Sequence, residues 1–401
     1  MLWLQSNIAL KFLRQNITQT ALILVGIAVG VSVIVFITTL INGLQANIIE
    51  RTLGTQAHIR VEPPDERNLI APLSGQAHRL VLEDPRAQRL RSINNWLAVQ
   101  STLDGLEAIT AVSPVISGPA FARRGAVRKS VSLVGIDPVR YQQIIPVGND
   151  IIDGEFRVGA GDTVIGSLLA RDLGLRVGGK LRIEAGDGRI ATVTIAGIFE
   201  LGVRELDLRY VYLDLKQAQS LLDLPGGVTV IDVTVTDLFQ ADTVARRIGQ
   251  LTGLKAESWI ETNAQLMNAL SSQRLSTTMI SFFVAVSVAF GIASVLAISV
   301  TQRTREIGIL RAMGMRRNQM LQVFLIQGAI LGMAGSAFGA AAGYALVWSF
   351  NTFGPRLFYI PLMPSLIPVT MLSATVTGVL AAMVPAWRAA RLNPVEAIRY
   401  V

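Results

Sequence analysis

Four long apolar stretches constrain this chain more than any other feature. They run over residues 21–44, 279–300, 320–348 and 366–387, and none of them contains Asp, Glu, Lys or Arg. The hydrocarbon core of a bilayer, about 30 Å thick, is crossed by a helix of roughly 20 apolar residues, so each stretch can span a membrane once. The residues between the first two stretches have the composition of a water-soluble domain. The sequence therefore predicts one span, a large domain and three further spans.

The expected boundaries follow from these stretches and from the charged residues that flank them. We expect an amphipathic N-terminal segment over 1–17, spans over 18–44, 277–300, 319–348 and 366–387, an external domain over 45–276, an internal loop over 301–318, a short external loop over 349–365 and an internal tail over 388–401. The first apolar run is longer than that of a signal peptide, so it is interpreted as a retained anchor. The helical patterns at Ala46–Leu53 and Ala264–Leu275 predict outward extensions of the first two spans.

The charge distribution orients this plan. Outside residues 45–276 the chain has eleven basic and two acidic residues, whereas the domain has 25 basic and 26 acidic residues. Ten of the eleven lie in the two termini or in the 301–318 loop. Short loops rich in Lys and Arg stay in the cytoplasm, so both termini and this loop are expected inside and the domain outside. A nucleic-acid binder would carry its basic excess on a soluble surface, so the net charge of +8 does not indicate nucleic acid as a partner.

The external domain is expected to be mixed α and β. Leu181–Ala185 and Ile190–Ile198 flank Gly186-Asp187-Gly188, a pattern typical of a β-hairpin. Val228–Thr236 alternates apolar and polar residues and predicts a strand with one buried face. Asp237 can cap a following helix that Gly253 ends, and Lys255–Trp259 predicts a further strand, which completes a β-α-β unit.

No motif in the chain predicts catalysis or a metal site. Gly174–Leu181 begins like a phosphate-binding loop, but Leu181 stands where Ser or Thr would bind Mg²⁺ and a strand follows, so a turn is predicted. His58 and His78 are the only histidines, and without cysteine they make zinc improbable; both are interpreted as surface residues. Arg123-Arg124 and Arg128-Lys129 are interpreted as the solvated face of a hairpin. The uncharged spans lack the ionisable groups of ion-driven carriers, so energy is expected to come from elsewhere.

Glycines at intervals of three or four residues suggest close helix packing. They are Gly26 and Gly30 in the first span, and Gly328, Gly332, Gly335, Gly339 and Gly343 in the third. Such spacing lets helix backbones approach closely, although added flexibility is the alternative explanation. The contact can lie within one subunit or between subunits.

The 301–318 loop has a helical pattern that topology alone does not require. Ile307, Leu310 and Met313 recur at helical spacing among charged residues, and Gly314 can end the helix. An amphipathic cytoplasmic helix of this kind is predicted to dock onto a soluble partner.

The same loop carries a resemblance to a known family. The run Arg305-Glu306-Ile307-Gly308-Ile309-Leu310-Arg311-Ala312-Met313-Gly314 resembles the cytoplasmic loop of the MacB/FtsX/LolC-LolE superfamily of ABC transporter permeases, and residues 385–400 resemble their C-terminal signature. The resemblance implies four transmembrane α-helices with a large mixed α/β extracytoplasmic domain between the first and second, the MacB-like (type VII) permease fold. It also implies a multi-pass protein of the bacterial inner membrane with both termini cytoplasmic.

Partners and a working principle are implied by the same resemblance. The coupling helix, with Arg305, Glu306, Ile307, Gly308, Leu310, Arg311, Ala312, Met313 and Gly314 as candidate contacts, would sit on a separate ABC ATPase. Two ATPases would join two permease subunits, identical or paralogous, together with a periplasmic carrier or adaptor. ATP and Mg²⁺ would bind the ATPase, and this chain would hold no cofactor and catalyse no reaction. ATP-driven closure would then move the external domains, a mechanism called mechanotransmission.

Three functions compete within this superfamily. Leu40–Leu44, Ala57–Val61 and Val134–Pro138 resemble LolC/LolE-type permeases, which extract lipoproteins from the inner membrane for a periplasmic carrier. The alternatives are MacB-like efflux with an adaptor and an outer-membrane channel, and FtsX-like regulation of a cell-wall hydrolase. A lipid-handling subunit would need an apolar opening just outside the bilayer, and the candidates for it are Ile48, Ile49, Leu53, Leu266, Met267 and Leu270. Residues 63–95 show no periodicity, and no role is assigned to them.

Overall fold

Four helices are long and apolar enough to cross a membrane: α2 (Ile17–Leu53), α10 (Ala264–Gln302), α12 (Arg317–Phe353) and α13 (Leu366–Arg391). A computed structural model describes residues 2–64, 90–186, 188–354, 359–361 and 364–392. Each predicted span lies inside one of these helices, so the prediction of four spans is confirmed. The chain forms two compact units, here called the membrane unit (Met1–Ile49 and Asn268–Val401) and the α/β unit (Glu50–Met267).

The unit boundaries fall inside α2 and α10, because both helices continue past the apolar stretches. Helix α2 has 37 residues and α10 has 39, and at 1.5 Å per residue each is longer than the roughly 30 Å that a bilayer core requires. The lead-ins Ala46–Leu53 and Ala264–Leu275 belong to these helices, as predicted. The α/β unit accordingly begins at Glu50 and ends at Met267, inside the predicted 45–276.

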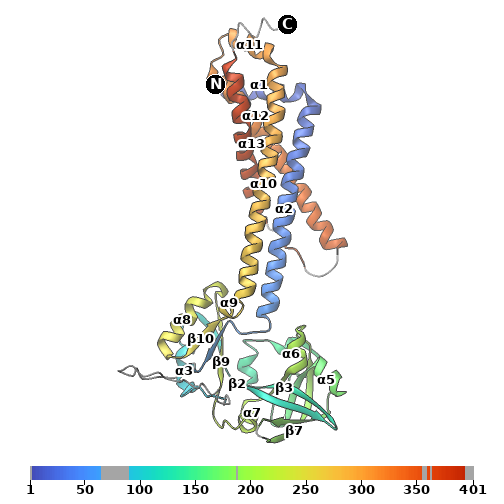
Figure 1. Cartoon of the computed structure of the whole chain (residues 1–401), viewed down its shortest axis with the longest axis vertical. Helices are drawn as coiled ribbons and strands as arrows, with labels where there is room; N and C mark the ends of the chain where they lie inside the picture. The colour runs from blue at the N-terminus through green and yellow to red at the C-terminus, as the bar shows by residue number, and fades with distance from the viewer. Residues whose placement is uncertain (1, 65–89, 187, 355–358, 362–363, 393–401) are drawn as a thin grey trace, which may run out of the picture. The chain divides into compact units, whose positions relative to one another are not determined.

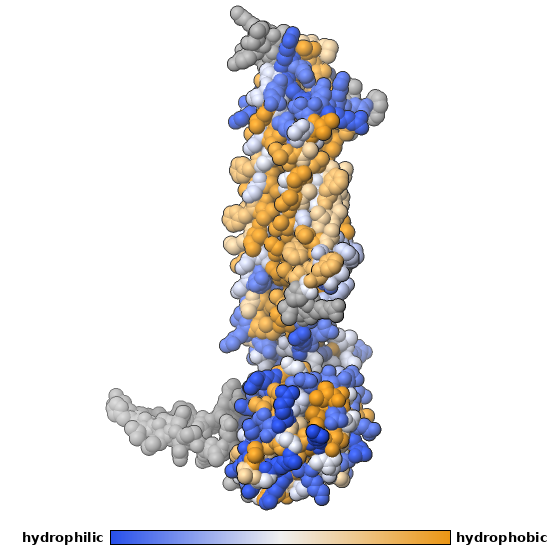
Figure 2. Space-filling view, turned by 90° about the vertical axis from the view of Figure 1, so that its right-hand side faces the viewer, coloured by the Kyte–Doolittle hydropathy of each residue, from blue (hydrophilic) through white to orange (hydrophobic). Residues whose placement is uncertain are grey.

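The membrane unit has an apolar interior to which all four long helices contribute. Ile27 and Val31 of α2, Leu296 of α10, Leu331 of α12 and Ala382 of α13 are buried together. Two shorter helices, α1 (Leu2–Gln15) and α11 (Thr304–Ala312), lie at one end of this bundle (Figure 1). The outward faces of the long helices form a broad hydrophobic band (Figure 2), as a lipid-facing surface requires.

The α/β unit is built on one sheet, which contains ten strands in the described residues. They are β1 (Ile59–Glu62), β2 (Ile109–Arg124), β3 (Val127–Ile136), β4 (Ile151–Gly154), β5 (Asp162–Gly166), β6 (Lys180–Ala185), β7 (Ile190–Phe199), β8 (Tyr210–Asp214), β9 (Val230–Val235) and β10 (Lys255–Ser258). Their order is β10-β1-β9-β2-β3-β8-β5-β7-β4, and β6 pairs with β2 and β7. The mixed α/β prediction is therefore confirmed.

Short helices connect the strands and form part of the core. They are α3 (Trp96–Asp104), α4 (Pro138–Tyr141), α5 (Ser167–Leu173), α6 (Arg204–Arg209), α7 (Leu215–Leu221), α8 (Ala241–Thr252) and α9 (Trp259–Thr262), with 3₁₀ turns η1 (Val147–Asp150) and η2 (Leu238–Gln240). Many of the buried apolar residues lie in two clusters. One contains Leu169 and Leu221, and the other contains Tyr141 and Phe199.

The predicted hairpin and β-α-β unit are both present. Strands β6 and β7 pair antiparallel, with Glu184 opposite Ile190. Strand β1 lies between β9 and β10 and is antiparallel to both, so the strands that α8 connects are parallel. Gly253 ends α8 with φ of 67°, as expected of a C-cap glycine. Asp237, predicted to cap this helix directly, instead caps η2 by accepting from the N–H of Phe239.

The prediction of one buried face for β9 is wrong. Ile231 and Asp232 point to opposite faces of the sheet, yet they are 0% and 5% exposed. The reason is that both faces of β9 are covered. Val230, on the same face as Asp232, packs in a buried cluster with Tyr141 of α4, and Ile231 and Val233 on the other face are 0% exposed. A polar alternation therefore marks a buried polar row here and not a solvated face.

Candidate functional site

Helix α11 divides the predicted coupling residues into an inner and an outer set. Ile307 and Gly308 are buried, with Ile307 packed beside Met320 and Phe324 of α12, and Leu310 and Arg311 are half-buried. The exposed members are Arg305, Glu306, Ala312, Met313 and Gly314, together with Ile309, which the sequence did not single out. Met313 is 72% exposed, so it does not continue the inward face of Ile307 as its spacing suggested. The helix ends before Met313, which is its C-cap.

Two arginines anchor this region to the rest of the membrane unit. Arg303 is 5% exposed, and its guanidinium donates to Gln15 Oε1 and to the carbonyl of Phe12, both at 2.8 Å. The guanidinium of Arg303 also lies over the Phe12 ring, 4.6 Å from its centroid. Arg311 bonds carbonyls at the end of α13. These arginines therefore fix the position of α11, which leaves its outer residues as the candidate contact surface.

Most of the predicted packing glycines lie against neighbouring helices of the same chain. A Cβ at Gly328 would lie 2.4 Å from the carbonyl oxygen of Gly378 in α13, and one at Gly332 would lie 2.8 Å from that of Ala374. Glycines 335, 339 and 343 face Ile27, Ala28 and Val35 of α2, and Gly30 faces Val288 of α10. The contacts are thus within the subunit. Gly26 differs, because it is exposed and a Cβ there would meet nothing within 4 Å.

The six candidates for an apolar opening lie at the ends of α2 and α10 where these helices pass into the α/β unit. Ile48, Ile49, Leu53, Leu266, Met267 and Leu270 are all half-buried. Within the membrane unit the two helices are adjacent at this level, since Gln45 Nε2 donates to the carbonyl of Leu270 at 3.5 Å. Partial exposure of apolar side chains just beyond the apolar stretches suits contact with a lipid chain.

The phosphate-loop pattern and the histidines of the α/β unit were the other candidate sites in its sequence. Gly174 ends α5 in the left-handed region and Gly178-Gly179 form the turn into β6, so the phosphate-loop pattern is a turn, as predicted. No cluster of three metal-ligating side chains occurs among the described residues. His78 lies outside the described residues.

The predicted basic hairpin is present, and its residues have partners. Strands β2 and β3 turn back with Arg123 opposite Arg128. Arg128 pairs with Glu184 at 3.2 Å and Lys129 pairs with Asp172 at 2.7 Å. Arg128 and Lys129 therefore form ion pairs on the surface of the α/β unit.

His58 is not the surface residue that the sequence suggested. Its ring is half-buried, and Nδ1 lies 3.1 Å from the backbone nitrogen of Val235 and accepts from it when neutral. Burial lowers the pKa of His58, partly opposed by the carbonyl of Val235. The side chain joins the start of β1 to the end of β9.

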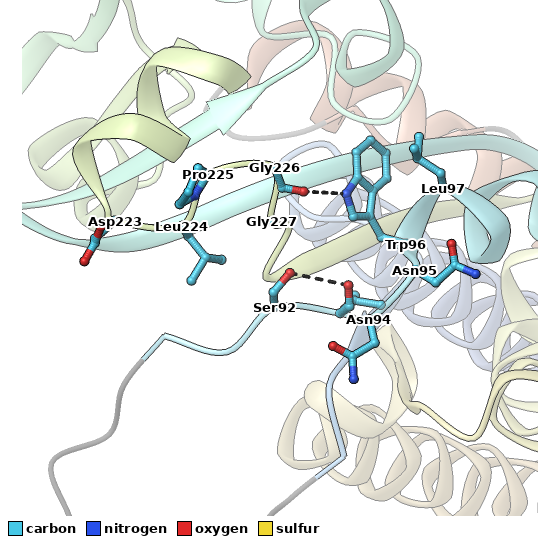
Figure 3. A pocket seen from close by; sticks show the side chains of 11 residues that line it. Ser92, Asn94, Asn95, Trp96, Leu97, Asp223, Leu224, Pro225, Gly226 and Gly227 are labelled. Carbon is cyan, nitrogen blue, oxygen red and sulfur yellow. Dashed lines mark hydrogen bonds between the residues drawn. The ribbon is translucent and has the colours of Figure 1, made fainter.

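A pocket of about 450 Å³ lies between residues 92–97 and 223–227 (Figure 3). The indole N–H of Trp96 donates to the carbonyl of Gly226 at 2.9 Å across it. Ser92 Oγ accepts from the N–H of Val228 at 3.1 Å. Asp223 is the ionisable residue of its lining, and it pairs with Arg189. These hydrogen bonds hold two connecting segments together, so we interpret the residues around the pocket as structural.

The fold and the helices define a multi-pass membrane protein with a mixed α/β domain between its first two spans. Family models agree with both parts: the MacB-like periplasmic core domain matches residues 20–251, and the FtsX-like permease C-terminal matches residues 278–394. The chain belongs to this family of ABC transporter permeases.

Curated relatives come from two branches of the family. LolC of Xylella fastidiosa (strain 9a5c) is 25% identical over 94% of this chain and 92% of its own length, and LolE of Haemophilus influenzae is 24% identical over 93% and 92%. The macrolide export ATP-binding/permease protein MacB of Azoarcus sp. (strain BH72) is 26% identical over 97% of this chain and 58% of its own length. The solved periplasmic region of MacB from Actinobacillus actinomycetemcomitans is 14% identical and covers 55% of this chain and 95% of its own, with a TM-score of 0.35.

Proposed function

We propose that this chain is the permease subunit of an ATP-driven ABC transporter that extracts lipoproteins from the inner membrane and passes them to a periplasmic carrier. The observation that carries this proposal is the match to LolC, a transmembrane protein of the lipoprotein-releasing system, over 94% of this chain and 92% of that relative. The match to MacB spans only 58% of that relative. The lipid-facing helices and the half-buried apolar residues at Ile48 and Met267 suit a substrate held by acyl chains.

Energy would come from a separate ABC ATPase, two copies of which join two permease subunits. The outer residues of α11, Glu306 and Met313 among them, would contact the ATPase, because they are exposed while Arg303 and Arg311 hold the helix in place. Both termini and α11 would lie in the cytoplasm, consistent with the arginines around them. The chain would transmit motion and would itself need neither a catalytic residue nor a cofactor.

MacB-like efflux is the second candidate function. It is favoured by the match to MacB of Azoarcus sp., which is 26% identical over 97% of this chain. In this function the α/β unit would meet an adaptor and an outer-membrane channel, and no lipid-anchored substrate would be needed.

Purification of the chain with its ATPase in nanodiscs, followed by mass spectrometry of bound molecules, distinguishes these functions. Triacylated lipoproteins that leave on addition of ATP and a periplasmic carrier support the proposal. Co-purification of an adaptor with an outer-membrane channel and no lipoprotein would replace it with efflux. A cell-wall hydrolase as the bound partner would replace both with regulation.

A further inference from the structure

Four neighbouring strands of the α/β unit carry polar residues directly opposite one another. Glu257 of β10 is paired with Arg60 of β1, Arg60 with Asp232 of β9, and Asp232 with Ser113 of β2. Residues paired in this way point to the same face of a sheet. Asp232 and Ser113 are 5% and 0% exposed. The row therefore carries a carboxylate into the interior, where a charge is costly unless it is paired and hydrogen-bonded.

The polar atoms of this row are incompletely bonded. Asp232 Oδ1 has no hydrogen-bond donor among the described residues, and Nε of Arg60 is 3.7 Å away, beyond hydrogen-bond range. Ser113 Oγ and Thr234 Oγ1, on the same face, also lack partners there. Burial raises the pKa of Asp232, and the positive charge of Arg60 partly opposes this rise. Buried polar atoms without partners are rare in native proteins, and each calls for an explanation.

A cavity of about 290 Å³ has Asp232 in its lining. Its lining includes Arg60, Asp232 and Glu257 together with the aromatic side chains of Tyr141, Tyr210 and Trp259. Gln56 also lines it, and the buried Nε2 of this residue has no hydrogen-bond partner in the part of the chain that the structure describes. The volume would hold about ten waters at roughly 30 Å³ each, or one small organic molecule.

The charges around the cavity favour a cation. Glu257 is paired with Lys255 at 2.7 Å, and Arg60 is shared between Glu62 at 3.6 Å and Asp232 at 3.7 Å. Two basic groups therefore stand against three carboxylates, which leaves one net negative charge. An ammonium group would give Asp232 Oδ1 its missing donor, and aromatic faces attract cations. A phosphate-bearing headgroup would instead meet the excess of carboxylates.

We propose that this cavity binds a small organic molecule that carries a protonated amine on an apolar body. The amine would bond Asp232, and the body would pack against Trp259 and Tyr210. Thr55 and Thr262 also line the cavity. The first follows α2 by two residues and the second precedes α10 by two. The site is thus bounded by both segments that connect the α/β unit to the long helices. It does not depend on which substrate the transporter carries.

Isothermal titration calorimetry on the full chain in mild detergent tests the proposal with phenethylamine as the probe. Its neutral counterpart, 2-phenylethanol, and phosphoethanolamine are titrated in parallel. We expect phenethylamine to bind at least tenfold more tightly than either of them. Asp232→Asn should weaken phenethylamine binding at least tenfold, while Asp153→Asn, the same chemical change at an exposed residue of β4, should leave it unchanged.

A second variant keeps the proposal testable if Asp232→Asn does not fold. Ala57 is half-buried and lines the cavity, so Ala57→Leu fills space there without changing any charge. It too should weaken binding at least tenfold. The proposal is overturned if phenethylamine does not bind the wild-type chain, if 2-phenylethanol binds equally well, or if binding survives in every folded cavity variant.

Discussion

Arg311 donates through Nη1 to the carbonyl oxygen of Ala390 at 3.2 Å, and so ties α11 to the end of α13. The same nitrogen bonds the carbonyl of Leu392. A helix C-terminus leaves its last carbonyls without partners inside the helix, and a guanidinium supplies donors for several of them. Arg311 is thus a structural residue of α11, whereas Glu306 and Met313 on the same segment are exposed.

We therefore predict different effects for the two sets of α11 residues. The double variant Glu306→Ala with Met313→Ala should weaken ATPase association by roughly tenfold, about 1.4 kcal/mol, and should leave the Tm of the solubilised chain unchanged. Arg311→Ala should lower that Tm, because removing its hydrogen bonds costs about 1–3 kcal/mol. Co-purification with the ATPase and thermal unfolding in detergent measure the two effects.

Leu97→Ala, at an exposed residue of the α/β unit, is the control for this experiment. An Arg311→Ala chain with unchanged Tm and weakened ATPase binding would contradict the assignment of roles. Unaltered association of the double variant would argue against docking on α11.

Gly328 and Gly26 form a matched pair for testing helix packing. Alanine at Gly328 places its Cβ 2.4 Å from the carbonyl oxygen of Gly378, so α12 and α13 must separate. Overpacking of this kind costs about 1–3 kcal/mol. Alanine at Gly26 meets nothing within 4 Å, and the better helix propensity of alanine makes this change neutral or slightly stabilising. Thermal unfolding in detergent should show a lower Tm for Gly328→Ala alone, and equal Tm values for the two variants would refute the packing role.

The glycine pair also shows what the sequence could and could not predict. The four spans were predictable because runs without charge have few alternatives to crossing a bilayer. The spacing of Gly328 and Gly332 indicated a close approach of helices. Spacing alone could not tell them from Gly26, because the partner helix and the rotation of each helix are decided by tertiary packing.

The same limit applies within the α/β unit and in α11. Asp232 occupies a polar position of the alternating strand β9, and only the tertiary structure, in which Tyr141 of α4 lies over the same face, shows that it is buried. Met313 continues the spacing of Ile307, yet α11 ends at Ala312, so the apolar face no longer extends to it. Periodicity predicts a face only while the element continues.

His58 predicts a pH dependence of stability. Because burial lowers its pKa below the unfolded value of 6.5, this residue contributes stability above about pH 6.5, and the contribution is lost as pH falls through the folded pKa. Protonation of Nδ1 also removes the acceptor for the N–H of Val235. Asn at this position can accept the same hydrogen bond without ionising. His58→Asn should thus match the wild type at pH 8 and unfold at a higher temperature at pH 5.

Thermal unfolding of the full chain across this pH range measures the effect. His58→Ala is the control, since it lacks the acceptor at every pH and should be less stable at pH 8 by about 1 kcal/mol, the worth of one hydrogen bond. If the Tm of the wild type and that of His58→Asn changed with pH in the same way, the pKa of His58 would be the same in the folded and the unfolded protein, and the prediction would be wrong.

The proposed apolar opening predicts how charge should affect the proposed lipoprotein release. Ile48 and Met267 are half-buried near the ends of α2 and α10, beyond the apolar stretches that cross the bilayer. A carboxylate facing acyl chains is costly, up to about 3 kcal/mol at full membrane depth. Ile48→Glu and Met267→Glu should therefore reduce ATP-driven lipoprotein release to a carrier by at least tenfold, measured in proteoliposomes that contain the ATPase.

Leu97→Glu is the control for this experiment, since it adds the same charge at a surface position of the α/β unit and should leave lipoprotein release unchanged. Protease protection first verifies that each variant inserts with the wild-type topology. Normal release by correctly inserted Ile48→Glu and Met267→Glu chains would remove these residues from the path of the substrate.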